Sequence, residues 1–302
     1  MDSEFAEARA LIFEPYTMFR VRAMTGRAVN VSEHGFRHGR VGDVWPPDPA
    51  AANIFVFGGS TTFGYGLPDE KTIPAQLAEQ LRGQLPGARP TVYNFATPND
   101  VAVQERIRFE QLLLDGHVPR VAVFIDGFDE FVGPYYAPLM LNRYVVATSA
   151  RSIRRRASQI VRELSSRMFR GPTAPDETSG RLPEPDAVLD QYAANMRLIG
   201  AACREFAVRP IFVWQPVPCY RYDGSSADHG VDSALLLDCV RAGYAQMEAR
   251  RRHLGDEFLW LADIQQGRAA DLYLDPDHYT AEFSAEIAQR IAWHLVERSL
   301  MG

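Results

Sequence analysis

One serine of this sequence follows a short apolar run and a pair of glycines. The run Ile54–Phe57 is too short for a helix and is rich in β-branched and aromatic residues, which favours a buried strand. Gly58 and Gly59 allow the chain to reverse without Cβ clashes. Ser60 would then lie at the carboxyl end of a strand, near backbone N–H groups that can face developing negative charge. This layout is typical of a nucleophile turn, although a phosphate-binding or simply tight turn fits the same stretch.

A second stretch near the end of the chain could supply a base. His278 follows Asp275 by three residues and precedes a predicted C-terminal helix. A serine nucleophile needs a base within reach, and the base needs a carboxylate that holds its ring in the correct tautomer. Asp275 and His278 can fill both roles from a single loop. The alternative is a helix-capping aspartate beside a surface histidine.

The elements that would position these residues alternate along the chain. Apolar runs predict five strands, over residues 54–57, 91–96, 120–125, 209–215 and 258–262. Helical periodicity predicts helices over 73–85, 101–114, 189–206, 233–253 and 284–300. Strands that alternate with helices indicate a three-layer α/β/α fold around a five-stranded parallel sheet, with ligands at the carboxyl ends of the strands. The polar residues that follow the first three strands should therefore share one edge of the sheet.

The length and composition are those of a globular protein. The chain has 302 residues, of which 46% are hydrophobic and 23% charged, and its net charge of −6 argues against nucleic acid as the main partner. Its three cysteines, without C-x-x-C spacing, predict reduced thiols and neither a disulfide framework nor a metal site. The acidic N-terminus lacks a signal-peptide pattern. These features favour a cytoplasmic location, although a chain from which an anchor had been removed would look the same.

We divide the chain into an N-terminal arm and linker over residues 1–52 and one α/β domain over 53–302, with an insertion at about 133–186. The arm has no clear periodicity and is predicted to be irregular. Within the insertion, residues 151–170 carry seven arginines and one glutamate, with the apolar residues on one helical face. A helix docked by its apolar face with solvated arginines is the favoured interpretation. A lid that binds an acidic substrate, an acyl-carrier partner or a membrane surface is the less favoured alternative.

The whole pattern resembles the SGNH/GDSL hydrolase family over roughly residues 53–300, outside the insertion. The first matching block is Gly58-Gly59-Ser60-Thr61-Thr62, with Gly59 where the commoner members have aspartate, and the last is the D-x-x-H of Asp275 and His278. The resemblance implies a serine esterase of flavodoxin-like fold that needs no metal or organic cofactor. It also implies that Ser60 is the nucleophile, His278 the base and Asp275 the residue that orients His278. The oxyanion would be held by the Ser60 backbone N–H, a second-block glycine N–H and a third-block asparagine.

The second block departs from the family pattern. The family usually has a glycine five residues after the asparagine that corresponds to Asn94, and here Asn99 stands at that position. A backbone N–H survives this change, asparagine tolerates unusual φ values, and its side chain could add a donor. We therefore count Gly59, Asn94 and Asn99 among the residues expected to contact the oxyanion or the substrate.

The third block departs more sharply, because Asp129 in Gly127-Phe128-Asp129-Glu130 replaces the usual asparagine. An ionised carboxylate would repel an oxyanion, and loss of one oxyanion donor costs about 2.7–4 kcal/mol. Three hypotheses fit. Asp129 is kept protonated by burial near Glu130 or Asp126 and donates as a neutral acid, or it binds a cationic or hydroxyl-bearing substrate in a different reaction, or the site binds a ligand without turnover.

The favoured function is hydrolysis of an ester or O-acyl group on a small or carrier-bound substrate, through an acyl-Ser60. One alternative is a divergent biosynthetic enzyme, which would be an acyltransferase, a lyase or a cyclase. The other is a non-catalytic module that binds a carbohydrate or acyl group.

Overall fold

We analysed a computed structural model of the chain, which describes residues 2–8, 10–39, 44–85, 90–133, 135, 182–224, 234–275 and 277–298. The predicted arginine-rich helix over 151–170 lies outside the described residues, as does most of the predicted insertion. None of the described helices combines the length and hydrophobicity that crossing a bilayer requires.

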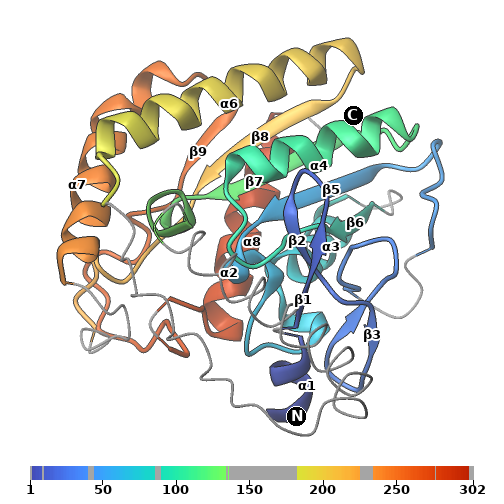
Figure 1. The fold of residues 1–302 in the computed structure, drawn as a ribbon, viewed down its shortest axis with the longest axis horizontal. Helices are drawn as coiled ribbons and strands as arrows, with labels where there is room; N and C mark the ends of the chain where they lie inside the picture. Colours follow the sequence, from blue (N-terminus) through green and yellow to red (C-terminus); the bar gives the residue numbers. More distant parts are fainter. Residues whose placement is uncertain are drawn as a thin grey trace, which may run out of the picture.

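The centre of the molecule is a five-stranded sheet with every strand parallel to its neighbours (Figure 1). Its order is β6-β5-β7-β8-β9, the flavodoxin-like order in which the second strand lies outside the first. All residues of β5 and β7 are buried, as expected for apolar strands that helices cover on both faces. The predicted sheet is therefore confirmed. Its strands are β5 (Asn53–Gly58), β6 (Thr91–Asn94), β7 (Val121–Asp126), β8 (Arg209–Trp214) and β9 (Phe258–Trp260).

Helices cover both faces of this sheet and make three layers (Figure 1). One face carries α3 (Ile73–Gln84) and α8 (Ala281–Glu297), and the other carries α4 (Ala102–Leu114), α6 (Pro185–Glu205) and α7 (Ala234–Arg250). Alternate residues of β5 separate the two cores, because Ile54 and Val56 pack with α3 and α8 whereas Phe55 and Phe57 pack on the other side.

The observed helix ends follow local capping chemistry. The Thr72 hydroxyl accepts the Ala75 N–H and begins α3, and the Thr280 hydroxyl accepts the Phe283 N–H and begins α8. Helix α6 begins at Pro185, four residues before the predicted start, because proline is favoured in the first turn of a helix. Helix α7 ends in a short 3₁₀ turn, η2 (Arg251–His253).

The N-terminal arm is more regular than its sequence predicted. It contains α1 (Asp2–Glu7) and two antiparallel pairs, of which β1 (Leu11–Glu14) pairs with β2 (Met18–Val21) and β3 (Met24–Thr25) with β4 (Asn30–Val31). Strands of two to four residues leave too few alternations for a periodicity test, which explains the wrong prediction. Beyond β4, the Arg37 N–H donates to the Asn94 carbonyl at 2.8 Å, so the arm reaches the edge strand β6 of the main sheet.

Candidate active site

Ser60 begins a four-residue helix, α2 (Ser60–Phe63), directly after β5. A Cβ on Gly58 would lie 2.4 Å from the Thr62 hydroxyl oxygen and 2.9 Å from the Ile125 carbonyl, so the turn is packed too closely for any side chain there. Gly64 ends the helix with a left-handed φ of 89° and donates its N–H to the Ser60 carbonyl. The sequence was correct in placing Ser60 on a tight turn at the carboxyl end of a central strand.

Asp275 and His278 form a close pair in the loop before α8. Both carboxylate oxygens of Asp275 lie 2.8 Å from His278 Nδ1, and Asp275 Oδ1 also accepts the His278 backbone N–H at 3.0 Å. The opposite ring nitrogen, Nε2, is buried and has no hydrogen-bond partner among the described residues. The imidazole therefore has one nitrogen held by a carboxylate and the other available to exchange a proton.

The charges of this pair depend on each other. Burial alone would raise the pKa of Asp275, but the hydrogen bond to His278 and the imidazolium charge lower that pKa to about 2. Burial opposes the charge on His278, yet the hydrogen bond to Asp275 and the nearby carboxylates raise the pKa of His278 above its usual value. Asp277 is one of these carboxylates, with Oδ1 at 3.2 Å from His278 Nδ1.

Two contacts bring the loop of His278 to the turn of Ser60. The Tyr65 N–H donates to the Ser60 carbonyl at 3.2 Å, and the Tyr65 ring lies 5.2 Å from the His278 ring, centroid to centroid. A Cβ on Gly66 would lie 3.0 Å from Leu274 Cδ1, so the two loops also touch one residue further along. The structure thus places the candidate nucleophile and the candidate base at the same edge of the sheet.

Asp129 lies against the same turn. Residues 128–133 are helical and follow β7 after Gly127. The carboxylate oxygen Oδ2 of Asp129 lies 1.7 Å from the position that a Cβ on Gly59 would occupy, so this carboxyl fills the place of a side chain at residue 59. Burial, with a smaller contribution from the charge of Asp277, raises the pKa of Asp129 to about 8, although His278 acts in the opposite direction. Burial therefore favours the protonated form of Asp129.

The two second-block asparagines occupy different environments. Asn99 has a left-handed φ of 65°, a conformation that glycine adopts freely and that asparagine tolerates better than most other residues. The preceding Thr97 donates its N–H to the Gly58 carbonyl at 3.0 Å, so this loop runs beside the nucleophile turn. Asn94 is buried, and its amide nitrogen lies 3.2 Å from the Thr62 carbonyl and 3.4 Å from the Phe63 carbonyl. These contacts tie β6 to α2.

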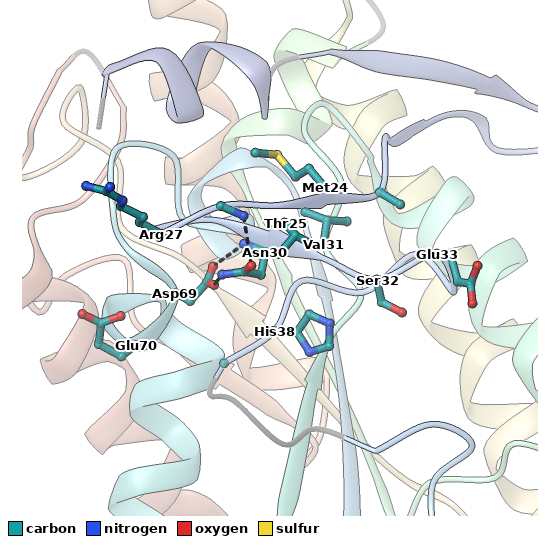
Figure 2. Close-up of a pocket in the computed structure, with 13 residues that line it drawn as sticks. Met24, Thr25, Arg27, Asn30, Val31, Ser32, Glu33, His38, Asp69 and Glu70 are labelled. Carbon is teal, nitrogen blue, oxygen red and sulfur yellow. Dashed lines mark hydrogen bonds between the residues drawn. The ribbon is translucent and has the colours of Figure 1, made fainter.

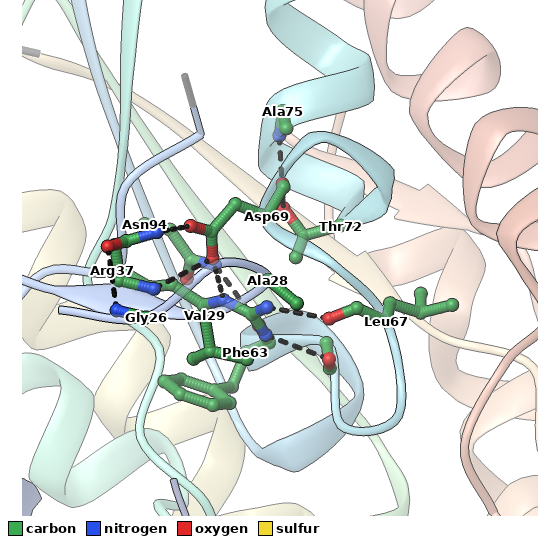
Figure 3. A network of polar contacts seen from close by, with 12 residues as sticks. Gly26, Ala28, Val29, Arg37, Phe63, Leu67, Asp69, Thr72, Ala75 and Asn94 are labelled. Carbon is green, nitrogen blue, oxygen red and sulfur yellow. Dashed lines mark hydrogen bonds and ion pairs between the residues drawn. The ribbon is translucent and has the colours of Figure 1, made fainter. Parts of the chain in front are cut away.

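A buried arginine from the arm, which sequence reasoning missed, supports the same helix (Figure 3). The Arg37 guanidinium donates to the carbonyls of Phe63, Gly64 and Leu67 at 2.6–2.9 Å. Its Nε atom lies 2.8 Å from Asp69 Oδ1. Arg37 thus binds the carbonyls that end α2 and the loop that contains Tyr65. A single arginine in a segment without periodicity gives no sequence signal for this role.

Further side chains, also missed, join α2 to the end of β8. The Thr61 hydroxyl lies 2.7 Å from Gln215 Oε1, and the Tyr279 hydroxyl donates to the Pro216 carbonyl at 2.7 Å. The Gln215 carbonyl accepts the Tyr244 hydroxyl at 3.0 Å. Because Tyr279 directly follows His278, these bonds fix the histidine loop and the nucleophile helix to the same strand end.

Several further carboxyls near the ends of β6 and β7 are buried. Burial raises the pKa of Asp126 to about 7. It also raises the pKa of Glu105 well above its usual range, and the charge of Asp126 adds to this shift. Burial likewise raises the pKa of Glu130 to about 8. The Glu130 carboxyl accepts the Ala102 N–H at 2.6 Å. Asp100, with a pKa raised by burial to about 7, lies 3.2 Å from an Arg108 nitrogen.

A pocket of about 1100 Å³ lies on the arm (Figure 2). It is lined by residues of β3, β4 and η1 (Asp69–Lys71), including Met24, Asn30 and Asp69. The Asp69 carboxylate accepts the Asn30 backbone and side-chain N–H groups at 3.2 and 2.8 Å, besides the bond from Arg37. Neither Ser60 nor His278 lines this pocket. We therefore assign the chemistry to the strand ends and not to this cavity.

Among the described residues, one group of side chains could hold a metal ion. It consists of Asp275, Asp277 and His278, whose ligand atoms lie within 4.8 Å of one another. Metal binding through His278 Nδ1 would require that nitrogen to give up its hydrogen bond to Asp275. The observed geometry fits a carboxylate that orients an imidazole.

No family model matches the sequence, and no curated protein matches it. Several solved structures are similar. One is described as a lipolytic protein of the G-D-S-L family from Desulfitobacterium hafniense, at 12% identity over 81% of this chain and 99% of that chain, with a TM-score of 0.44. A variant of the acetylxylan esterase Axe2 from Geobacillus stearothermophilus has 12% identity over 81% and 94% of the two chains and a TM-score of 0.47. TesA has 12% identity over 80% and 97%, with a TM-score of 0.42.

Proposed function

We propose that this chain is a serine hydrolase of the SGNH type that cleaves an ester or O-acyl group through an acyl-Ser60. The observation that carries the proposal is the state of His278. One ring nitrogen is held by Asp275, the other is buried without a partner among the described residues, and the ring lies beside the turn of Ser60. The two motifs that resemble the family in sequence, the block around Ser60 and the D-x-x-H of Asp275 and His278, support the same assignment.

The reaction would have two halves. Ser60 Oγ attacks the acyl carbon while His278 Nε2 takes the hydroxyl proton, and the imidazolium is stabilised by Asp275. When the tetrahedral intermediate collapses, the bond to the alcohol breaks and His278 returns the proton to the departing alkoxide. Water then attacks the acyl-Ser60 carbon with His278 again as base, and collapse releases the acid and regenerates Ser60.

The oxyanion of each intermediate would be bound at the start of α2. The Ser60 N–H is at the first position of this helix and is directed along its N-terminal end. The left-handed Asn99 supplies a second backbone or side-chain donor from the loop after β6. Asn94 contributes indirectly, because its amide bonds hold α2 against β6.

Hydrolysis of p-nitrophenyl acetate by the purified chain tests this function. We expect turnover that Ser60→Ala and His278→Ala each abolish and that Ser32→Ala leaves unchanged. Ser32 is a suitable control because it lines the pocket on the arm and not the candidate site. Equal turnover by the native chain and Ser60→Ala would contradict the proposal. A covalent acetyl-Ser60 that forms but resists water would instead favour acyl transfer.

A further inference from the structure

Asp129 stands where the family has an asparagine that donates a hydrogen bond. We propose that Asp129 acts as a neutral carboxylic acid, whose O–H donates to the oxyanion beside the Ser60 N–H. This inference rests on the proposed function and adds a catalytic residue that works only while it is protonated.

The position of the carboxyl supports a direct role. Asp129 Oδ2 lies 1.7 Å from the place of a Cβ on Gly59. Gly59 is joined through one peptide bond to the Ser60 nitrogen, so the carboxyl lies within one peptide unit of the N–H that would face the oxyanion. Any larger residue at position 59 would displace this carboxyl. The carboxyl therefore occupies the turn itself and not the solvent around it.

The surroundings of Asp129 favour its neutral form. The residue is 7% exposed, so its charged form would lose most of its hydration. The charge of His278 favours ionisation, and the acids that oppose it are Asp277, the adjacent Glu130 and Asp100. The groups that interact with Asp129 are Asp100 after β6, Asp126 and Glu130 near its own helix, Asp277 and His278 before α8, and the Tyr244 and Tyr279 hydroxyls.

A protonated carboxyl can replace an asparagine amide as a donor, whereas a carboxylate cannot. The O–H would bond to the carbonyl oxygen as negative charge develops there, and the proton stays on Asp129 throughout, so no additional proton transfer is needed. Deprotonation would remove the donor and place a negative charge beside the oxyanion. The reaction should therefore fail at alkaline pH even though His278 is then fully competent as a base.

The experiment measures the rate at which a fluorophosphonate modifies Ser60 between about pH 5.5 and 9.5, in the native chain, Asp129→Asn and Asp129→Ala. We expect the native rate to fall about tenfold per pH unit above about 8, as the neutral form is depleted. Asp129→Asn should remove this fall, because an amide does not titrate, and should react at about pH 6 within a few fold of the native rate. Asp129→Ala should be about 10²–10³ slower at the optimum pH.

Glu130→Gln is the matched control. Glu130 is the adjacent residue, is equally buried and has a pKa that burial also raises to about 8, but its carboxylate accepts the Ala102 N–H and does not touch the turn. We expect this variant to keep an alkaline fall, with its midpoint moved to lower pH, because the charge of Glu130 also raises the pKa of Asp129.

Three outcomes would overturn the inference. They are an alkaline fall that is unchanged in Asp129→Asn, an Asp129→Asn rate that exceeds the native rate at every pH including about 6, and loss of Ser60 modification in a folded Asp129→Asn. Absence of Ser60 modification in the native chain would instead overturn the proposed function, and the inference with it. The thermal unfolding midpoint of each variant shows whether it is folded.

Discussion

At the scale of single residues, the contact between Gly59 and Asp129 defines what is unusual about this site. A glycine precedes Ser60, and an acid from the end of another strand fills the space beside it. The carboxyl still reaches the turn, because β5 and β7 are adjacent and parallel. Two substitutions that look independent in the sequence therefore meet in the structure.

This contact predicts that substitutions at the two positions are coupled. Gly59→Ala should lower the rate of Ser60 modification strongly in the native chain, because its Cβ would overlap Asp129 Oδ2. In an Asp129→Ala background the same change should cost little, because only the Asp129 Cβ remains, 3.6 Å from the new atom. A double-mutant cycle on the modification rate measures the coupling. Additive effects of the two changes would show that the contact has no functional consequence.

The two aspartates beside His278 give a second prediction. In serine proteases, converting the orienting aspartate to asparagine lowers kcat about 10⁴-fold. Asp275→Asn should lower kcat by less here, because Asp277 Oδ1 lies 3.2 Å from the same Nδ1 and can accept a hydrogen bond from it. Asp275→Asn/Asp277→Asn should show the full loss. The measurement is kcat for p-nitrophenyl acetate, and a double variant no slower than Asp275→Asn would rule out the supporting role of Asp277.

At the scale of elements, the arm and the nucleophile helix depend on one side chain. Arg37 is 1% exposed, and it binds three carbonyl groups at the end of α2 as well as Asp69. Arg37→Ala should lower the free energy of unfolding by about 3–5 kcal/mol, because it leaves the buried Asp69 carboxylate without its cation. Arg27→Ala, at an exposed arginine of the same arm, should change it by less than about 0.5 kcal/mol.

Denaturant unfolding measures the free energy of unfolding of Arg37→Ala and Arg27→Ala. The rate of Ser60 modification gives a second readout that is specific to the turn. Arg37→Lys separates charge from geometry, because lysine keeps the charge but cannot present a planar fork to several carbonyls. We expect Arg37→Lys to slow the modification of Ser60 even where it remains folded. A folded Arg37→Lys with the native modification rate would show that Arg37 stabilises the arm alone.

The sequence predicted the main elements well, for a physical reason. Strands such as β5 and β7 are buried on both faces, so they are continuous apolar runs, and helices such as α8 have a regular apolar face. The arm could not be predicted in the same way, because its strands are short and Arg37, a residue type usually exposed, is buried by hydrogen bonds to distant carbonyls. Of the candidate site, the motif residues were predicted from type, spacing and the family resemblance, whereas the contacts of Gln215 and Tyr279 depend on strand order.

At the scale of the whole molecule, the sheet edge holds several carboxyls whose pKa values burial raises. Asp100, Asp126, Asp129 and Glu130 have pKa values raised by burial to about 7 or 8. Their unfolded values lie near 4, so between about pH 4 and 8 the folded chain binds more protons than the unfolded chain. The stability that these groups contribute is complete below about pH 4 and is lost as the pH rises through their folded pKa values.

We therefore expect the free energy of unfolding to fall between about pH 5 and pH 9. Glu105→Gln should make this fall shallower, because it removes one of the coupled acids while a polar side chain remains next to Asp126. Denaturant unfolding at three pH values measures the slope. A stability that rises from about pH 5 to 9 would contradict the assignment of these acids as protonated in the folded chain.

The same arrangement connects the function to the fold. The order of the strands places β5 between β6 and β7, so the loops after all three converge on Ser60. The loop before α8 adds Asp275 and His278 from the other end of the chain. A catalytic serine at this point is the central claim of the account.

Mass spectrometry of the chain after treatment with a fluorophosphonate tests that claim most directly. We expect one adduct per chain, located on Ser60 by peptide mapping, lost in Ser60→Ala and formed much more slowly in His278→Ala. An unmodified chain, or an adduct on another residue that persists in Ser60→Ala, would contradict it.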